Sequence, residues 1–96
     1  MEIPLTLTDY LNRAELVYGD QIAVVDEPDQ PAEPLKDLTY KELSNSARGL
    51  AAGLDELGIE LGSRIAMVSQ NSARMLIFLF GTSAFGRIGV PINFRL

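Results

Sequence analysis

The stretch that decides the fold is residues 61–96, LGSRIAMVSQNSARMLIFLFGTSAFGRIGVPINFRL. A short apolar run, Ile65 to Val68, leads through a turn into a long apolar helix that we expect to reach about Arg87. A second short run, Val90 to Ile92, follows two glycines. A strand, helix and strand with tight connections form a βαβ unit, here over residues 65–92, whose strands lie parallel through a right-handed crossover. The fold class predicted is therefore α/β, with a partial parallel sheet.

The same stretch also predicts burial. Ile65 to Val68 is apolar throughout, which is typical of a strand covered on both faces. Met75 to Phe80 is apolar around the whole helix, so we expect burial on all sides. A chain of 96 residues has little else to cover this helix. Some apolar surface should stay open, and we expect the isolated chain to form a homodimer through it.

The helix upstream has the clearest boundary signals in the chain. Thr39 and Glu42 form the T-x-x-E pattern of a capping box, with Leu38 and Leu43 at the two positions of the hydrophobic staple. Apolar residues then recur at steps of three and four up to Gly58, which is the natural left-handed stop. The pattern predicts an amphipathic helix closed at both ends.

Closer to the N-terminus we expect a first helix over Leu7 to Tyr18, with Thr8 as its N-cap, and a strand over Ile22 to Val25. Residues 27–36 carry three prolines among acids and predict the loop of an antiparallel hairpin. The expected order is helix, strand, strand, helix, strand, helix, strand, in a single unit over residues 1–96.

Composition limits the possible functions. All thirteen acidic residues fall within residues 1–60, and the four arginines that follow are scattered, so nucleic acid is not an expected partner. The chain has no cysteine and no histidine, which excludes thiolate metal sites and a Ser-His-Asp triad. No targeting segment precedes the first helix, and no apolar run is long enough for a membrane span. We expect a cytoplasmic protein.

Two short motifs are candidate ligand sites. Gly81 to Ile88 spaces two glycines as a phosphate loop does, but Arg87 and Ile88 replace the lysine and hydroxyl residue, and the pattern lies late in a helix. Small residues for close helix packing explain it better. Gln70, Asn71 and Ser72 stand at the carboxyl end of a parallel strand, where α/β proteins bind anions. Helix capping by Asn71 or Ser72 explains the same residues without a ligand.

The carboxylates show no acid-base pair. Asp55, Glu56 and Glu60 flank the end of the second helix and are expected to be solvated, although acids in a last turn oppose the helix dipole. From the residues alone we assign no catalytic, cofactor-binding or metal-binding residue.

The pieces taken together resemble the adenylate-forming acyl-CoA synthetases, the AMP-binding enzyme family. They are YGDQIAVVDE from Tyr18, LTYKELSNSARGLAAGLDELGI from Leu38 and residues 62–96, in this order. The family's G-D-R-V-A strand reads G-S-R-I-A here, with Ser63 and Ile65 as the replacements. Phe94 replaces a proline in the family's P-x-N-P-R-L strand. Fatty-acyl and aryl-acid CoA ligases look most similar.

The resemblance implies that the chain is an N-terminal subdomain fragment of a larger ligase. Such an enzyme requires Mg and converts a carboxylate, ATP and CoA to acyl-CoA, AMP and pyrophosphate. The resemblance does not decide whether the carboxylate is a fatty acid or an aryl acid. The phosphate loop, the adenine-binding motif and the C-terminal lysine of the family have no counterpart in this sequence. We therefore expect the chain itself to be structural and inactive, with the rest of the enzyme as its partner. The alternative is a free-standing, non-enzymatic α/β interaction module.

Overall fold

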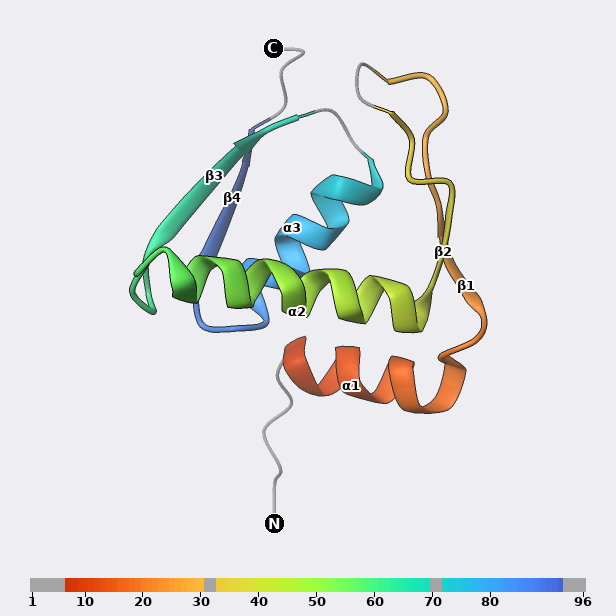
Figure 1. The fold of residues 1–96 in the computed structure, drawn as a ribbon, viewed down its shortest axis with the longest axis horizontal. Helices are drawn as coiled ribbons and strands as arrows, with labels where there is room; N and C mark the ends of the chain where they lie inside the picture. Colours follow the sequence, from red (N-terminus) through yellow and green to blue (C-terminus); the bar gives the residue numbers. More distant parts are fainter. Residues whose placement is uncertain (1–6, 31–32, 70–71, 93–96) are drawn as a thin grey trace.

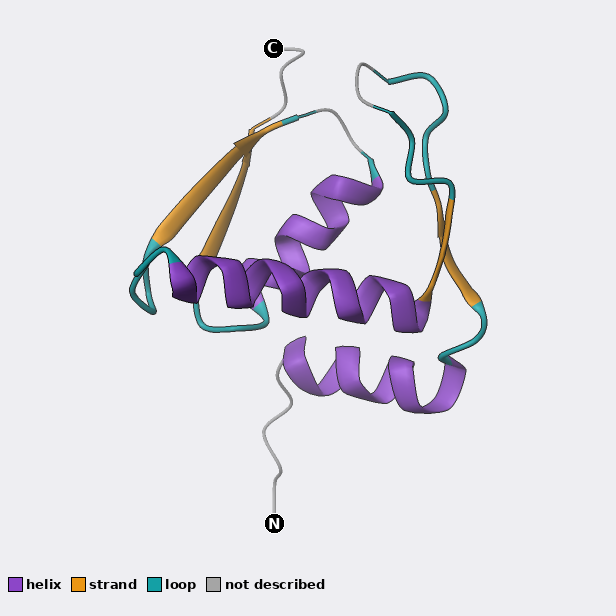
Figure 2. Ribbon diagram, in the orientation of Figure 1, coloured by secondary structure: helices purple, strands orange, loops and turns teal. Residues whose placement is uncertain are grey.

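The computed structural model describes residues 7–30, 33–69 and 72–92, and Figures 1 and 2 show the arrangement. The elements occur in the predicted order. They are α1 (Leu7–Tyr18), β1 (Ile22–Val25), β2 (Asp37–Thr39), α2 (Tyr40–Glu56), β3 (Arg64–Val68), α3 (Ala73–Ser83) and β4 (Ile88–Ile92).

Two small sheets stand on either side of α3. β1 and β2 pair antiparallel, and β3 and β4 pair parallel with Arg64 opposite Ile88 and Val68 opposite Ile92. Figure 1 shows α2 crossing α3 between the sheets, with α1 alongside α2. The predicted hairpin and the parallel pair are confirmed, and the core forms where the three helices meet.

α2 begins and ends as its sequence predicts. The Thr39 hydroxyl accepts from the Glu42 N–H at 3.1 Å, and the Glu42 carboxylate accepts from the Thr39 N–H at 3.0 Å. At the other end Gly58 has a φ of 75°, and the Ile59 N–H donates to the Leu54 carbonyl. This is a Schellman ending, in which the left-handed glycine lets the chain fold back over the last turn.

The expected N-cap of α1 is wrong. The helix already includes Leu7, so Thr8 lies within the first turn, and its hydroxyl donates to the carbonyl of Ala84. Ala84 is the C-cap of α3, where a carbonyl has no partner within its own helix. Thr8 therefore fastens the start of α1 to the end of α3.

α3 ends earlier than the predicted limit near Arg87. It stops at Ser83, because the Thr82 carbonyl accepts from both the Phe85 and Arg87 N–H groups and Gly86 turns with a φ of 87°. The turn lets β4 start at Ile88, two residues before the predicted strand. Local apolar pattern continues past this point, so only the turn's backbone bonds reveal the end.

Burial is also less complete than expected. In β3, residues 64, 66 and 68 are exposed and only the alternate positions are half-buried, because α3 packs against the sheet from one side. Within Met75 to Phe80, only Met75 and Phe78 are buried, and the other four side chains are partly exposed. The predictions of two covered faces for β3 and full burial for α3 are therefore wrong for this chain.

Candidate functional site

The carboxyl end of β3 and the start of α3 form the first candidate site. Ser72 is the N-cap of α3, and its hydroxyl accepts from the Met75 N–H at 3.4 Å. Gln70 and Asn71 lie outside the described residues. The capping interpretation of Ser72 is confirmed, and this end of the helix carries one more contact that the sequence did not suggest.

That contact comes from Asp26, directly after β1. The residue is only 5% exposed, and its Oδ1 accepts from the Ala73 N–H at 2.8 Å. Burial raises the pKa of the Asp26 carboxyl, but the hydrogen bonds that it accepts lower it further, so the net pKa lies below the ordinary value. Asp26 therefore stays ionised at neutral pH, and the first N–H of α3 already has an anionic partner. An acid ending an apolar strand was the only signal of this role in the sequence.

The second candidate, Gly81 to Ile88, has no phosphate-loop geometry. The Arg87 side chain is 2% exposed and its guanidinium faces the end of α2, donating to the Ile59 carbonyl at 2.5 Å and to Asp55 Oδ1 at 2.6 Å. Asp55 is 68% exposed, as expected of a solvated acid, but it also has a partner in the fold. It pairs with a cation that sits near the carboxyl end of the helix, which offsets its unfavourable position in the last turn. Glu56 and Glu60 are exposed.

The glycine of this motif serves packing. A Cβ on Gly81 would lie 2.7 Å from the Leu50 Cδ2 and 3.0 Å from the Ala47 carbonyl oxygen, so only glycine fits between α3 and α2. A Cβ on Gly89 would likewise meet the Thr82 hydroxyl at 2.5 Å. The close-packing interpretation is confirmed for Gly81. Gly86, the second glycine of the motif, instead forms the turn with a φ of 87°, and Gly89 lies just after the motif.

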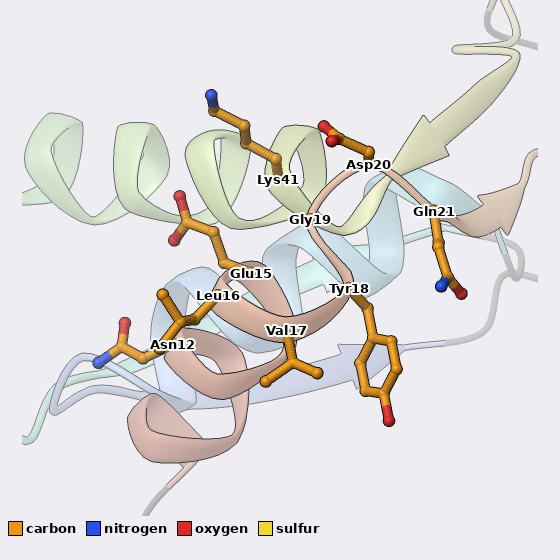
Figure 3. Close-up of a pocket in the computed structure, with 9 residues that line it drawn as sticks. All are labelled: Asn12, Glu15, Leu16, Val17, Tyr18, Gly19, Asp20, Gln21 and Lys41. Atoms are coloured by element: carbon orange, nitrogen blue, oxygen red, sulfur yellow. The ribbon is translucent and has the colours of Figure 1, made fainter.

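An open hollow of about 780 Å³ lies between the end of α1, the turn into β1 and the start of α2. Figure 3 shows the residues that line it, with the charged side chains of Glu15, Asp20 and Lys41 at its rim. Gly19 forms part of this turn. Glycine is required there because a Cβ would lie 2.5 Å from the Glu15 carbonyl oxygen. The hollow is wide and mixed in charge, and no group in it is arranged as an acid-base pair.

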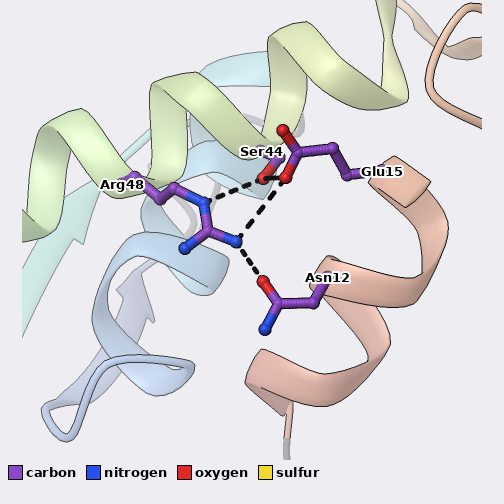
Figure 4. Close-up of polar contacts among 4 residues, drawn as sticks. All are labelled: Asn12, Glu15, Ser44 and Arg48. Carbon is purple, nitrogen blue, oxygen red and sulfur yellow. Dashed lines mark hydrogen bonds and ion pairs between the residues drawn. The ribbon is translucent and has the colours of Figure 1, made fainter.

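Glu15 is instead committed to a polar network between α1 and α2 (Figure 4). It accepts from the Ser44 hydroxyl at 2.8 Å and lies 3.6 Å from Arg48, whose guanidinium also bonds Ser44 and Asn12. Arg48 further sits 5.7 Å from the ring centre of Phe85. The network holds α1 against α2, which explains how a helix with a single buried residue stays in place.

The two candidate ligand sites of the sequence have partners within the fold. Within residues 7–30, 33–69 and 72–92, no three metal-binding side chains gather at one place. The Asp26 carboxylate accepts from the first N–H of α3, and the Arg87 guanidinium donates to Asp55 at the end of α2. Over the same residues no helix has the length and apolar character to cross a membrane.

Comparison with known proteins places these observations in a family. A family model described as "AMP-binding enzyme" matches residues 11–96. A chloroplastic long-chain-fatty-acid–[acyl-carrier-protein] ligase of Arabidopsis thaliana is 41% identical over 73 residues, which is 76% of this chain and 10% of the relative. A feruloyl-CoA synthase of an Amycolatopsis species is 42% identical over 59 residues, 62% of this chain and 12% of the relative. The chain thus spans about a tenth of these relatives.

Solved structures share the fold. An anthranilate CoA ligase in complex with anthranoyl-AMP matches 100% of this chain and 17% of its own, with a TM-score of 0.82 and 26% identity. A structure described as a putative long-chain-fatty-acid CoA ligase from Rhodopseudomonas palustris matches 96% of this chain and 22% of its own, with a TM-score of 0.77 and 29% identity. The arrangement of two small sheets around α3 is therefore one that larger ligases contain.

Proposed function

Because this chain belongs to the AMP-binding enzyme family, we propose that it is the N-terminal part of an ATP-dependent acyl-CoA synthetase. The observation that carries the proposal is the family match over residues 11–96, together with relatives that are named as a fatty-acid ligase and a CoA synthase. The parent enzyme would join a fatty or aryl carboxylic acid to AMP, releasing pyrophosphate, and then transfer the acyl group to CoA. We expect it in the cytoplasm.

In this proposal the chain's role is structural. Catalysis of phosphoryl and adenylyl transfer depends on donors pre-organised around the phosphates. Two of the candidates for that work are already used inside the fold: Arg87 bonds Ile59 and Asp55, and the first N–H of α3 bonds Asp26. The groups that hold ATP, Mg and CoA would then lie in the remainder of the parent enzyme.

A pyrophosphate-release assay tests this role. The 96-residue chain, given ATP, Mg²⁺ and several fatty and aryl acids, should give no turnover above a blank without protein. The full reading frame that contains this sequence should release pyrophosphate and, with CoA, form thioester. Turnover by the 96 residues alone would contradict the structural role. An immunoblot of the source cells that finds only a band at the mass of this chain would favour a free-standing interaction module instead.

We also propose that the isolated chain covers the open face of α3 by self-association. Two hollows of about 270 and 340 Å³ share Leu76 and Phe80 and are lined almost entirely by apolar side chains. At about 25 cal/mol per Å², covering such a face contributes several kcal/mol. In the parent enzyme the remaining chain would cover it, and a second copy would do so here.

Light scattering at micromolar concentration gives the outcome. We expect about twice the monomer mass of 10.5 kDa. Leu79→Lys, on one of the hollows, should restore the monomer, whereas Leu16→Lys, on the exposed side of α1, should not. A monomer for the unmodified chain would contradict the proposed dimer but not the family-level function.

A further inference from the structure

Asp26 is a buried side chain to which neither the family match nor the proposed function gives a role. It uses both carboxylate oxygens. Oδ1 accepts from the N–H groups of Ala73 (2.8 Å) and Glu27 (2.9 Å). Oδ2 accepts from the Leu35 N–H (2.7 Å) and the Gln30 side-chain amide (3.0 Å). Four donors therefore converge on one carboxylate.

These donors come from segments far apart in the chain. Glu27 and Gln30 follow β1, Leu35 precedes β2, and Ala73 is the first residue of α3, 47 positions after Asp26. The contacts join the proline-rich side of the hairpin to the start of α3. The backbone bond from the Asp26 N–H to the Lys36 carbonyl (3.1 Å) closes the same end of the hairpin.

We propose that Asp26 is a positioning residue, whose carboxylate occupies a four-donor anion cradle and thereby fixes the start of α3 against the β1–β2 loop. The start of α3 follows β3 at the sheet edge where α/β proteins place their ligands. Ser72, the N-cap, is adjacent to the anchored Ala73. Any ligand-facing geometry at this edge would then depend on Asp26 through its bond to Ala73.

The cradle requires a carboxylate rather than a side chain of the same shape. Asparagine would present its NH₂ group to two donors in either orientation, the pair on Oδ1 or the pair on Oδ2. A buried donor without an acceptor carries its full desolvation penalty. If Asp26 served only to fill space, asparagine would be tolerated. The comparison of Asp with Asn therefore separates the effect of the negative charge from the effect of side-chain volume.

The first experiment measures thermal unfolding of Asp26→Asn beside Asp37→Asn. Asp37 stands opposite Val25 in the hairpin, is exposed, and loses the same charge on substitution. We expect Asp26→Asn to lower Tm by roughly 5–10 °C, and Asp37→Asn to leave it within about 2 °C. In hydrogen exchange, the Ala73 and Leu35 amides should lose at least about tenfold protection beyond any change at the Leu54 amide.

The second experiment restores the anion from solution. Asp26→Gly removes the side chain and leaves room for a small carboxylate among the same donors. Sodium formate should raise the Tm of this variant relative to sodium chloride at equal ionic strength, because an anion that binds only the folded state stabilises it. The unmodified chain should show no such difference. If the variant is unfolded in chloride, circular dichroism should show helix returning in formate.

Both results are required. An Asp26→Asn variant that melts with the unmodified chain would overturn the proposal, since a neutral side chain would then serve equally well. An Asp26→Gly variant that responds identically to formate and chloride would overturn it too, because the donors would not form an anion cradle. Neither outcome bears on whether the parent protein is a ligase.

Discussion

α2 and α3 contact each other along the centre of the molecule, yet they depend on their surroundings in opposite ways. α2 carries its own start and stop signals, and its capping box and Schellman ending form from residues within a few positions of each other. α3 has a local N-cap in Ser72, but it is also held at its start by Asp26 and at its end by Thr8, both distant in sequence. A helix can therefore be closed by local chemistry or by the rest of the fold, and only the first kind is readable in advance.

The largest expected effect concerns the contact between the two helices. Gly81→Val places a side chain into Leu50 and the backbone of Ala47, and overpacking of this kind should lower the free energy of unfolding by about 3 kcal/mol. Urea unfolding measures it. Gly53→Ala on α2 is the control, since no atom lies within 4 Å of an added Cβ, and it should stabilise by about 0.5–1 kcal/mol. If Gly81→Val is no less stable than Gly53→Ala, the close contact between the two helices at Gly81 would be contradicted.

The next effect concerns Arg87, which joins the turn after α3 to the end of α2. Arg87→Met keeps the apolar stem but leaves the Ile59 carbonyl without its donor, which should destabilise by about 2 kcal/mol. Asp55→Asn should change stability by less than about 1 kcal/mol, because Asp55 is 68% exposed and the amide oxygen of the asparagine can still accept from Arg87. Chemical denaturation of the two variants should show this asymmetry. A larger loss from Asp55→Asn than from Arg87→Met would contradict it.

A smaller effect tests the local closure of α2. Thr39→Ala removes the acceptor of the Glu42 N–H and should destabilise by about 1 kcal/mol, whereas Thr39→Ser should recover most of the loss. Thermal melts provide the measurement. If Thr39→Ala melts at the temperature of the unmodified chain, the capping box contributes nothing to stability.

The last effect appears only in acid and tests the distant closure of α3. The folded pKa of Asp26 lies below its unfolded value, so its contribution to stability is present above the unfolded pKa, about 3.9, and is lost as pH falls through the lower folded pKa. Denaturant unfolding from pH 5 downward should show a steeper loss of stability for the unmodified chain than for Asp26→Asn. Glu27, the neighbouring acid, is present in both and cancels. Parallel pH profiles would show that Asp26 does not titrate differently on folding.

The sequence by itself determined most of the local structure, apart from the N-cap of α1 and the end of α3. The order of seven elements, the limits of Leu7–Tyr18 and Ile22–Val25, both ends of α2 and the parallel pairing of β3 with β4 are as predicted. The helix limits rest on capping, on glycine conformations and on apolar periodicity, whose partners lie within about five residues. The family motifs, which are also runs of neighbouring residues, were recognisable for the same reason. The pairing of β3 with β4 was predictable for another reason, because a strand, helix and strand with short connections form a parallel βαβ unit.

Only the tertiary structure decided which polar groups form hydrogen bonds with residues distant in the sequence. Asp26 meets Ala73, Thr8 meets Ala84, and Arg87 meets Ile59 across separations that no sequence period encodes. Burial of β3 and α3 was overestimated for a related reason. Apolar composition states which surfaces avoid water, but the elements available to cover them are a property of the assembled chain.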